Sequence, residues 1–202
     1  MTLIRKIFTK SLQRAKGFTL LETMVAVTLL AVAIVAPMSL TAQSLASAYY
    51  ARDEVTAFYL AQEGLETVRN VRDNNILQNS QGSTLVDLLN NIPSKSGQPF
   101  RVDARNNSMT LCSADSLPGG VCKPIETDGT LYGYGLSPSA PTQFTRTLTA
   151  CFVQTNGTCT SAPTDEVKIT ATVSWKTQSI QTRTVNISEN LYRWVADGSA
   201  AG

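Results

Sequence analysis

A single carboxylate interrupts the long apolar run near the start of this chain. Glu22 is the fifth residue of the run, which covers residues 18–40 and contains no other charged side chain. An acidic group held deep in lipid costs roughly 3 kcal/mol. A cation about 4 Å away, at an effective dielectric constant near 20, would return about 4 kcal/mol. The sequence therefore predicts either that Glu22 meets a cation or that it reaches the lipid headgroups from the edge of the span.

The cation has to come from outside this part of the chain. No basic side chain lies between Gly17 and Arg52. A cut between Gly17 and Phe18 would create a new α-amine at the head of the run. The Glu22 carboxylate of one chain could then meet the Phe18 amine of a neighbouring chain, which would make Glu22 an assembly carboxylate.

Residues suited to catalysis are sparse elsewhere. The chain contains no histidine, which removes the commonest general base, the usual partner of a Ser or Cys nucleophile and the commonest zinc ligand. It also contains no P-loop, no glycine-rich dinucleotide loop and no nucleophile elbow. We therefore expect that the protein is not an enzyme, with no cofactor, no metal site and no catalytic residues.

Four cysteines follow the apolar run, and their even number favours disulfides if this part of the chain lies outside the cytoplasm. They are Cys112, Cys122, Cys151 and Cys159. Four cysteines allow three connectivities, and the local one pairs Cys112 with Cys122 and Cys151 with Cys159. Four free buried thiols are the alternative. A zinc site is disfavoured because the spacing is not C-x-x-C and no histidine is present.

The apolar run is long enough to cross a bilayer as a helix. Residues 1–17 carry five basic side chains and no acidic one, which predicts a cytoplasmic N-terminus and a single-pass topology. Residues 18–202 carry 12 basic and 15 acidic side chains, a net charge of −3. This balance gives no evidence of a nucleic-acid partner.

A helical pattern continues beyond the membrane edge. Apolar residues recur at spacings of three and four, with charged residues between them, at Ala48, Ala51, Val55, Phe58, Ala61, Leu65 and Val68. We therefore expect one long helix, with a transmembrane half over residues 18–40 and an amphipathic half over residues 41–75. Pro37 and Gly64 are its weak points. Residues 76–99 are expected to form a connector with a short helix at residues 84–91.

The remaining chain has the alternating pattern of strands, and we expect an antiparallel β-sheet domain over residues 100–196. A hairpin is predicted around Asn106 and Asn107, and the clearest strand is residues 167–175, whose odd-numbered side chains are apolar. Residues 119–135 are expected to be irregular, and residues 197–202 to form a flexible tail. The apolar face of the sheet needs a cover, which the helical stripe can supply, so the predicted fold class is α+β.

The segment "KGFTLLETMVAV" resembles the type IV prepilin signal, the cleavage and methylation signal of type IV pilins and pseudopilins. The resemblance rests on a basic leader ending at Gly17, then Phe18, Thr19, Leu20, Leu21 and Glu22. It covers about residues 16–40 and implies that a prepilin peptidase removes residues 1–17 and methylates the amine of Phe18. It also implies that Glu22 helps to register the subunit in a filament. In this family a long N-terminal helix packs on a C-terminal antiparallel sheet.

The resemblance implies a structural subunit, with features that lean toward a minor pilin, of a type IV pilus or related extracellular filament. Its partners would be prepilin peptidase, other pilin subunits, an inner-membrane assembly platform and lipid around residues 18–40. The subunit would wait in the bacterial cytoplasmic membrane and then enter an extracellular or periplasmic filament. The alternatives are a pseudopilin of a type II secretion system and a membrane-anchored or secreted adhesin-like binding module that does not polymerise.

A different cleavage is also conceivable, because residues 46–48 read Ala-Ser-Ala. Signal peptidase could cut after Ala48 and release a soluble domain that begins at Tyr49. The length of the apolar run argues against this, since an ordinary signal peptide has only about 7–15 apolar residues. The presence of Glu22 within the run argues against it as well.

Overall fold

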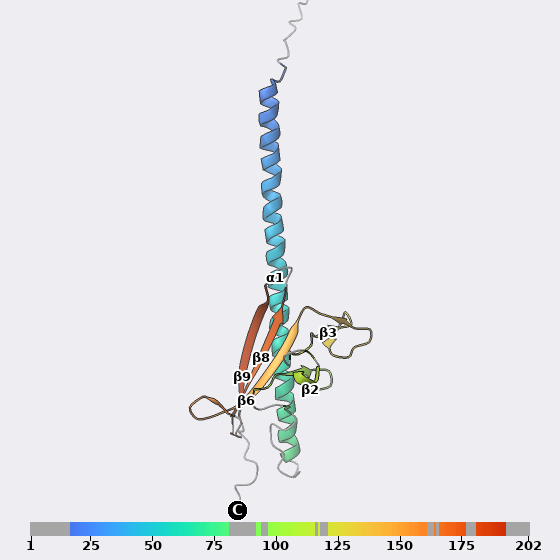
Figure 1. Cartoon of the computed structure of the whole chain (residues 1–202), viewed down its shortest axis with the longest axis vertical. Helices are drawn as coiled ribbons and strands as arrows, with labels where there is room; N and C mark the ends of the chain where they lie inside the picture. The colour runs from blue at the N-terminus through green and yellow to red at the C-terminus, as the bar shows by residue number, and fades with distance from the viewer. Residues whose placement is uncertain are drawn as a thin grey trace, which may run out of the picture. The chain divides into compact units, whose positions relative to one another are not determined.

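The computed structural model of the chain describes residues 17–80, 92–93, 97–115, 117, 121–160, 164, 166–176 and 181–192. The chain divides into two compact units, Met1–Ser47 and Ala48–Gly202. One helix, α1 (Leu20–Ser80), runs through both, and in the second unit it packs against an antiparallel sheet (Figure 1). This arrangement confirms the predicted α+β class and fits a pilin-like fold.

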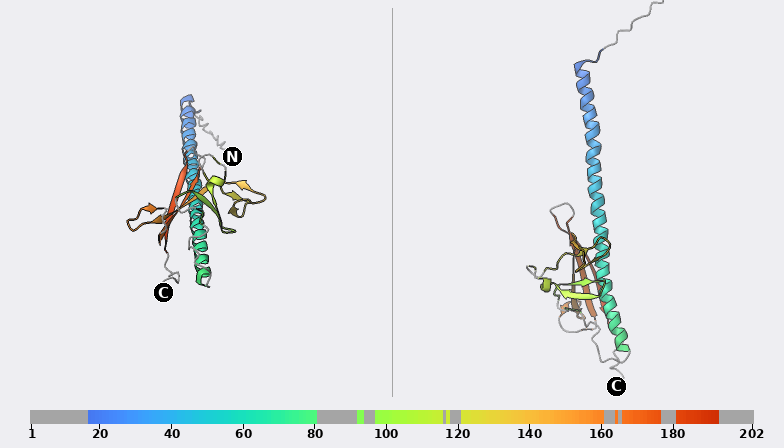
Figure 2. Two further views of the ribbon diagram at one scale, coloured as in Figure 1. Left: turned by 60° about the horizontal axis from the view of Figure 1, so that its bottom comes forward. Right: turned by 90° about the vertical axis from the view of Figure 1, so that its right-hand side faces the viewer.

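The main sheet has the strand order β2-β1-β6-β8-β9, and every neighbouring pair is antiparallel. Its strands are β1 (Phe100–Asp103), β2 (Ser108–Leu111), β6 (Thr145–Val153), β8 (Glu166–Trp175) and β9 (Arg183–Tyr192). The short β7 (Cys159–Thr160) pairs with the end of β6. The views in Figure 2 show this sheet packed against the C-terminal part of α1.

Two strand predictions are confirmed in detail. The odd-numbered side chains of β8, from Val167 to Trp175, are all buried, as the alternation predicts. The hairpin between β1 and β2 turns at Asn107, which has a φ of 55°. Asparagine tolerates this left-handed conformation better than most residues do, and this accounts for its place in the turn.

The irregular stretch that we expected at residues 119–135 contains regular structure, so that prediction is wrong in part. A second sheet, of order β4-β3-β5, is formed by β3 (Glu126–Thr127), β4 (Tyr132–Gly133) and β5 (Ala140–Pro141). A 3-10 helix, η1 (Cys112–Asp115), follows β2. Each of these strands is only two residues long, too short to show an alternating pattern in the sequence.

The buried face of α1 is rotated from the predicted stripe. Ala61, Leu65 and Val68 are buried as expected, but Val55 and Phe58 are 54% and 45% exposed. The buried face also includes Ala57, Leu60, Gly64 and Val71. This face carries the smaller side chains, which allow the helix backbone to approach the sheet closely.

Gly64 shows how close this approach is. A Cβ atom at position 64 would lie 3.1 Å from Cδ of Arg146 and 3.4 Å from Cδ1 of Leu148. The first distance is tighter than an ordinary van der Waals contact. Gly64, which the sequence marked only as a weak helix former, therefore serves as the contact point between α1 and β6.

The helix also continues past its predicted end at Asn75, to Ser80. Polar side chains near that point bond to other residues of the helix: Arg72 pairs with Asp73, and Asn74 donates to Asn70. Because the side chains of Asp73 and Asn74 bond to neighbouring side chains of the helix, they do not compete for its backbone groups, and the helix continues. The predicted short helix at residues 84–91, the leader at residues 1–16 and the tail at residues 197–202 lie outside the described residues.

The core of the second unit contains a charged side chain that the sequence did not single out. Arg146 is 1% exposed, although it lies among threonines on β6. Its Nη1 donates to the carbonyl of Leu60 at 2.8 Å and to Oε2 of Glu63 at 2.6 Å, and its Nη2 donates to the carbonyl of Val102 at 2.7 Å. Arg146 thereby fixes α1 against β6 and β1.

Candidate processing and assembly site

The first turn of α1 is capped by Thr19. The backbone N–H of Glu22 donates to Oγ1 of Thr19 at 3.2 Å, and the N–H of Thr23 donates to the Thr19 carbonyl at 3.1 Å. A threonine at the N-cap with a glutamate three residues later is the spacing of a capping box. An acidic group in the first turn also interacts favourably with the positive end of the helix dipole. Glu22 therefore suits the helix start, a role that the Thr-x-x-Glu spacing signals and that our sequence analysis missed.

The bond between Gly17 and Phe18 lies in non-helical backbone just before α1, and both residues are exposed. A Cβ atom at Gly17 would meet no other atom within 4 Å. The fold itself thus places no demand for glycine at this position. The bond between Gly17 and Phe18 is accessible to a protease. Any requirement for glycine at position 17 would have to come from the active site of that protease.

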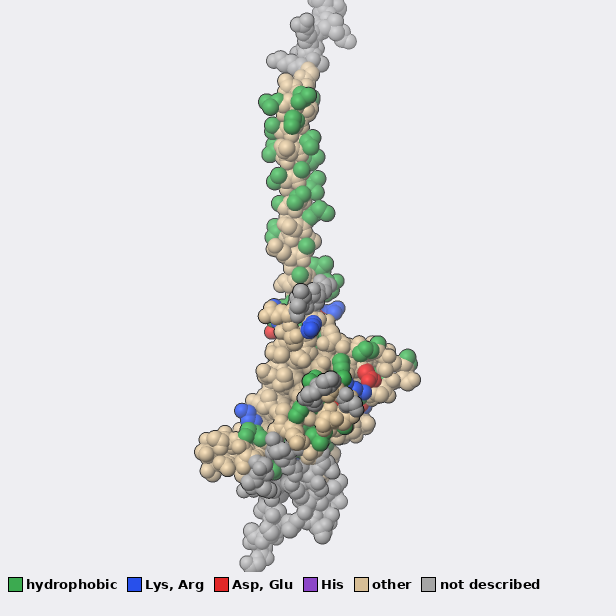
Figure 3. Space-filling view, viewed as in Figure 1, with side chains coloured by type: hydrophobic (Ala, Val, Ile, Leu, Met, Phe, Trp, Pro, Cys, Tyr) green, Lys and Arg blue, Asp and Glu red, His purple; other side chains and the backbone are tan. Residues whose placement is uncertain are grey.

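The helix that follows carries an uncovered apolar surface. Every residue from 17 to 49 is exposed, including large side chains such as Leu20, Leu29, Ile34 and Leu40. Figure 3 shows hydrophobic side chains along this part of the helix. By length and composition α1 is suited to cross a membrane. Apolar surface of this extent calls for lipid or other apolar helices as its surroundings.

Three hydroxyl groups of the run donate hydrogen bonds within the helix. Thr23, Thr28 and Ser39 each donate to the carbonyl three residues earlier, at 2.8–2.9 Å. Such bonds matter in lipid, where no water is present to replace them. The Glu22 carboxylate differs, because it has no ion-pair partner among the described residues. Glu22 is the one charged residue of 18–40, and a cation for it would have to come from outside the described residues.

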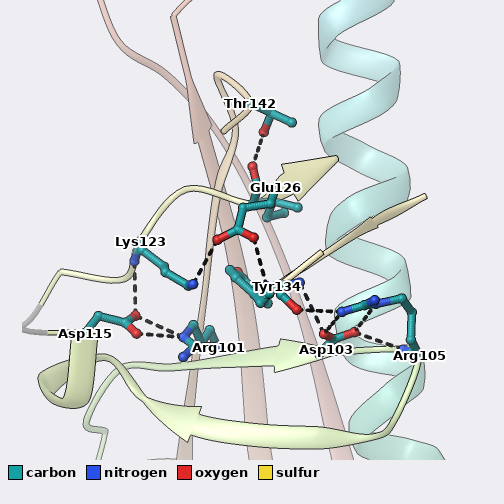
Figure 4. Close-up of polar contacts among 10 residues, drawn as sticks. Arg101, Asp103, Arg105, Asp115, Lys123, Glu126, Tyr134 and Thr142 are labelled. Carbon is teal, nitrogen blue, oxygen red and sulfur yellow. Dashed lines mark hydrogen bonds and ion pairs between the residues drawn. The ribbon is translucent and has the colours of Figure 1, made fainter. Parts of the chain in front are cut away.

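The second unit holds a different polar cluster, which links β1, η1 and the small sheet (Figure 4). Arg101 Nε donates to both carboxylate oxygens of Asp115, at 2.9 and 3.0 Å, and its guanidinium lies 4.6 Å from the Tyr134 ring centroid. Lys123 binds Glu126 at 2.9 Å, and Glu126 accepts from the N–H of Gly135 at 2.8 Å. These contacts hold the segment between β2 and β6 against the main sheet.

Asp103 and Arg105 form the other half of this cluster. Arg105 Nη2 donates to Asp103 Oδ2 and to the carbonyl of Tyr134, each at 2.6 Å. Burial raises the pKa of the Asp103 carboxyl, but the hydrogen bonds from Arg105 and Tyr134 outweigh it and lower that pKa below its ordinary value. Burial also raises the pKa of the Tyr134 hydroxyl to about 12. The opposite charges of this cluster satisfy one another, so we assign it to structure.

All four cysteines are paired, in the local connectivity. Cys112 bonds to Cys122, across ten residues of sequence, and Cys151 bonds to Cys159, across eight. The first bridge ties the start of η1 to Cys122, and the second ties the end of β6 to β7. Both bridges therefore restrain loops of the second unit.

The comparison with protein families assigns the N-terminal segment. Residues 12–36 match the prokaryotic N-terminal methylation motif, the prepilin signal of type IV pilins and pseudopilins. No curated protein and no solved structure matches the chain. The motif, followed by a long apolar helix and an antiparallel sheet, supports a type IV pilin-like or pseudopilin protein, and it indicates a structural role.

Proposed function

We propose that the chain is a structural subunit, of the minor-pilin kind, of a type IV pilus or related extracellular filament. Prepilin peptidase cuts after Gly17 and methylates the amine of Phe18. The subunit waits in the cytoplasmic membrane with residues 18–40 in lipid. An inner-membrane assembly platform then moves it into the filament, where apolar helices of neighbouring subunits replace the lipid.

One observation carries this proposal: the methylation motif runs directly into a helix whose apolar surface is exposed on all sides. A monomer in lipid and a subunit in a helical bundle both cover such a surface. The accessible, non-helical bond at Gly17 agrees with cleavage there. The same motif occurs in pseudopilins, so a type II secretion pseudopilin is the second candidate.

Glu22 supplies the electrostatic part of the proposal. Its carboxylate lies near the helix start and has no ion-pair partner among the described residues, and cleavage creates an amine at Phe18. The amine of one subunit pairs with the Glu22 of its neighbour and offsets the cost of holding this charge among apolar helices. This pairing would set the axial register of the filament.

The deciding measurement is mass spectrometry of the N-terminal peptide from the membrane and filament fractions of the native host. We expect a chain that begins at Phe18 and carries one additional methyl group. A chain that begins at Tyr49 would show a released soluble domain, and an uncut Met1 would show a plain membrane anchor. Either of these results would refute processing as a prepilin. The abundance of the processed subunit relative to others in purified filaments would then distinguish a minor from a major pilin.

Substitution of Glu22 tests the assembly role. We expect Glu22→Ala and Glu22→Gln to be cleaved and kept in the membrane but absent from filaments, because neither side chain can pair with the Phe18 amine. Thr28→Ala is the matched control, since it removes a hydroxyl that bonds only within the helix. Incorporation of Glu22→Gln at the wild-type level would disprove the pairing.

A further inference from the structure

The main sheet ends in a long strand with a free edge. β9 is the last strand in the order β2-β1-β6-β8-β9, so within the described residues only its β8 side is paired. All ten of its residues pair with β8 in an uninterrupted register, which leaves no bulge. It contains neither lysine nor proline. Native proteins usually protect edge strands by shortness, bulges, lysine, proline or inward-facing charges. Of these devices β9 has only the last, at Arg183 and Glu189.

The opposite edge of the sheet shows the contrast. β2 has only four residues and runs directly into η1. Shortness of this kind is one of the usual protections of an edge. The free edge of β9 is therefore the better candidate for pairing with an added strand.

The two faces of β9 indicate what kind of strand would fit. On the face away from α1, Thr184, Asn186, Ser188 and Asn190 are exposed and uncharged. On the face toward α1, Val185 and Ile187 pack against the core. The charged residues Arg183 and Glu189 lie on this same face, two residues outside that apolar pair. A fitting partner strand has a neutral polar face and an apolar face flanked by charges of opposite sign.

We propose that this partner is β9 of a second copy of the chain, in an antiparallel pair with Asn186 opposite Asn186. In that register Val185 lies opposite Ile187, and Arg183 lies opposite Glu189, each twice. Directly opposed residues of opposite charge stabilise antiparallel pairs. Among antiparallel registers, only this one places Arg183 opposite Glu189, and it also keeps the α1 sides of both copies on one face.

The charged residues of this register are already held by α1. Glu189 Oε1 accepts from Arg69 Nη2 at 2.5 Å, and the Arg183 guanidinium lies 5.1 Å from the Tyr50 ring centroid. Both side chains are thus directed along the α1 face before any pairing. In the pair, each Glu189 carboxylate would lie between Arg69 of its own chain and Arg183 of the other.

The symmetry of the pair determines which subunits it can join. A two-fold axis through Asn186 reverses β9, and it also reverses the part of α1 that lies lengthwise along the sheet (Figure 1). Two subunits with opposite helix directions cannot be neighbours along one filament. The pair would therefore link subunits of different filaments. The contact itself depends only on the second unit and can be tested whether or not filaments form.

Cysteine cross-linking of the full chain in detergent extracts of host membranes tests this register, because chains released from the membrane are free to take opposite helix directions. The four native cysteines are in disulfides, so one introduced cysteine supplies the only free thiol. In the proposed pair, Asn186→Cys brings two thiols to Cβ atoms about 5 Å apart, and a short bis-maleimide should give a covalent homodimer. Asn190→Cys is the matched control on the same exposed face, where the two copies would be about 27 Å apart.

A homodimer of Asn186→Cys in at least tenfold excess over that of Asn190→Cys is the expected result. Equal yields from both variants, or a homodimer from neither, would overturn the proposal. A cross-link from position 186 to a different protein would overturn it too, and would assign the edge to that partner.

Charge reversal gives a second, independent result. In the Asn186→Cys background, Arg183→Glu places a glutamate opposite Glu189 twice, and we expect about a tenfold loss of homodimer. Lys168→Glu on the neighbouring strand β8 makes the same change of charge away from the edge, and it should leave the yield unchanged. Equal yields from the two charge variants would rule out the Arg183–Glu189 register.

Discussion

At the residue scale, the most informative side chain is Arg146, whose buried guanidinium joins β6 to α1 and β1. Arg146 is in phase with Phe144 and Leu148, so the alternation of β6 places this arginine on the apolar face of the strand. Its position is explained only by acceptors from distant parts of the chain, the carbonyls of Leu60 and Val102 and the carboxylate of Glu63. Pairing across 86 residues of sequence cannot be inferred from a local pattern.

Two substitutions of Arg146 separate its charge from its volume. Arg146→Ala removes the hydrogen bonds and leaves a cavity, and we expect it to lower the free energy of unfolding by about 3 kcal/mol. Arg146→Met fills most of the space, so the loss should be about 1 kcal/mol. Urea unfolding in mild detergent, followed by tryptophan fluorescence, measures both. Equal losses for Ala and Met would show that hydrogen bonding, rather than packing, sets the effect.

Asp103 predicts an acid-dependent loss of stability. Its pKa is lowered in the folded state, where hydrogen bonds from Arg105 outweigh the effect of burial. A lowered pKa contributes stability above the usual carboxyl pKa of about 4, and that stability is lost as the pH falls through the lower, folded-state value. Between pH 5 and pH 3 the free energy of unfolding should therefore fall more in the wild type than in Asp103→Asn. Parallel pH profiles of the two proteins would contradict this assignment.

At the element scale, strands with clear alternation were predictable and the helix face was not. β8 follows from its period of two, since each odd-numbered side chain is apolar and buried. α1 carries two apolar arcs in the second unit, and hydrophobicity alone favoured the one with Val55 and Phe58. The sheet instead packs on the adjoining arc with Ala57 and Gly64, because close approach depends on small volume.

The start of α1 was predicted in part. The order of residues 17–22 predicted the prepilin signal and, through it, the candidate cleavage and assembly site. The capping of the helix by Thr19 was not predicted, because the apolar run continues through Phe18 and Thr19 without a break that would mark the helix start. The capping role and the assembly role of Glu22 both depend on its position three residues after Thr19 and four after Phe18.

The disulfides are expected to stabilise the second unit by reducing the conformational entropy of its unfolded chain. For loops closed by bridges eight and ten residues apart, the loop-closure relation gives about 2.5 kcal/mol each. We expect the Cys151→Ser/Cys159→Ser variant to lose about that much free energy of unfolding, measured with urea. The Cys112→Ser/Cys122→Ser variant should lose at least as much, because its bridge also holds η1 beside the Arg101–Asp115 pair. No loss in either variant would show that the loops are held by their other contacts alone.

At the scale of the whole molecule, the two units differ in how they cover apolar surface. Every described residue of the hydrophobic core belongs to the second unit, while the apolar side chains described in the first unit, over residues 17–47, are exposed. A chain that begins at Tyr49 should therefore remain soluble and unfold at the same urea midpoint as the full chain in detergent. Precipitation of that chain, or a much lower midpoint, would show that the second unit needs the first to fold.

The hydroxyl bonds inside the apolar helix have a consequence for reversibility. Thr23, Thr28 and Ser39 keep the same acceptors whatever surrounds the helix, because those acceptors belong to the helix itself. Exchange of lipid for protein neighbours then breaks none of these bonds, and the return exchange needs none to be remade. Such a segment can be extracted and reinserted repeatedly without a hysteresis from its hydroxyl groups.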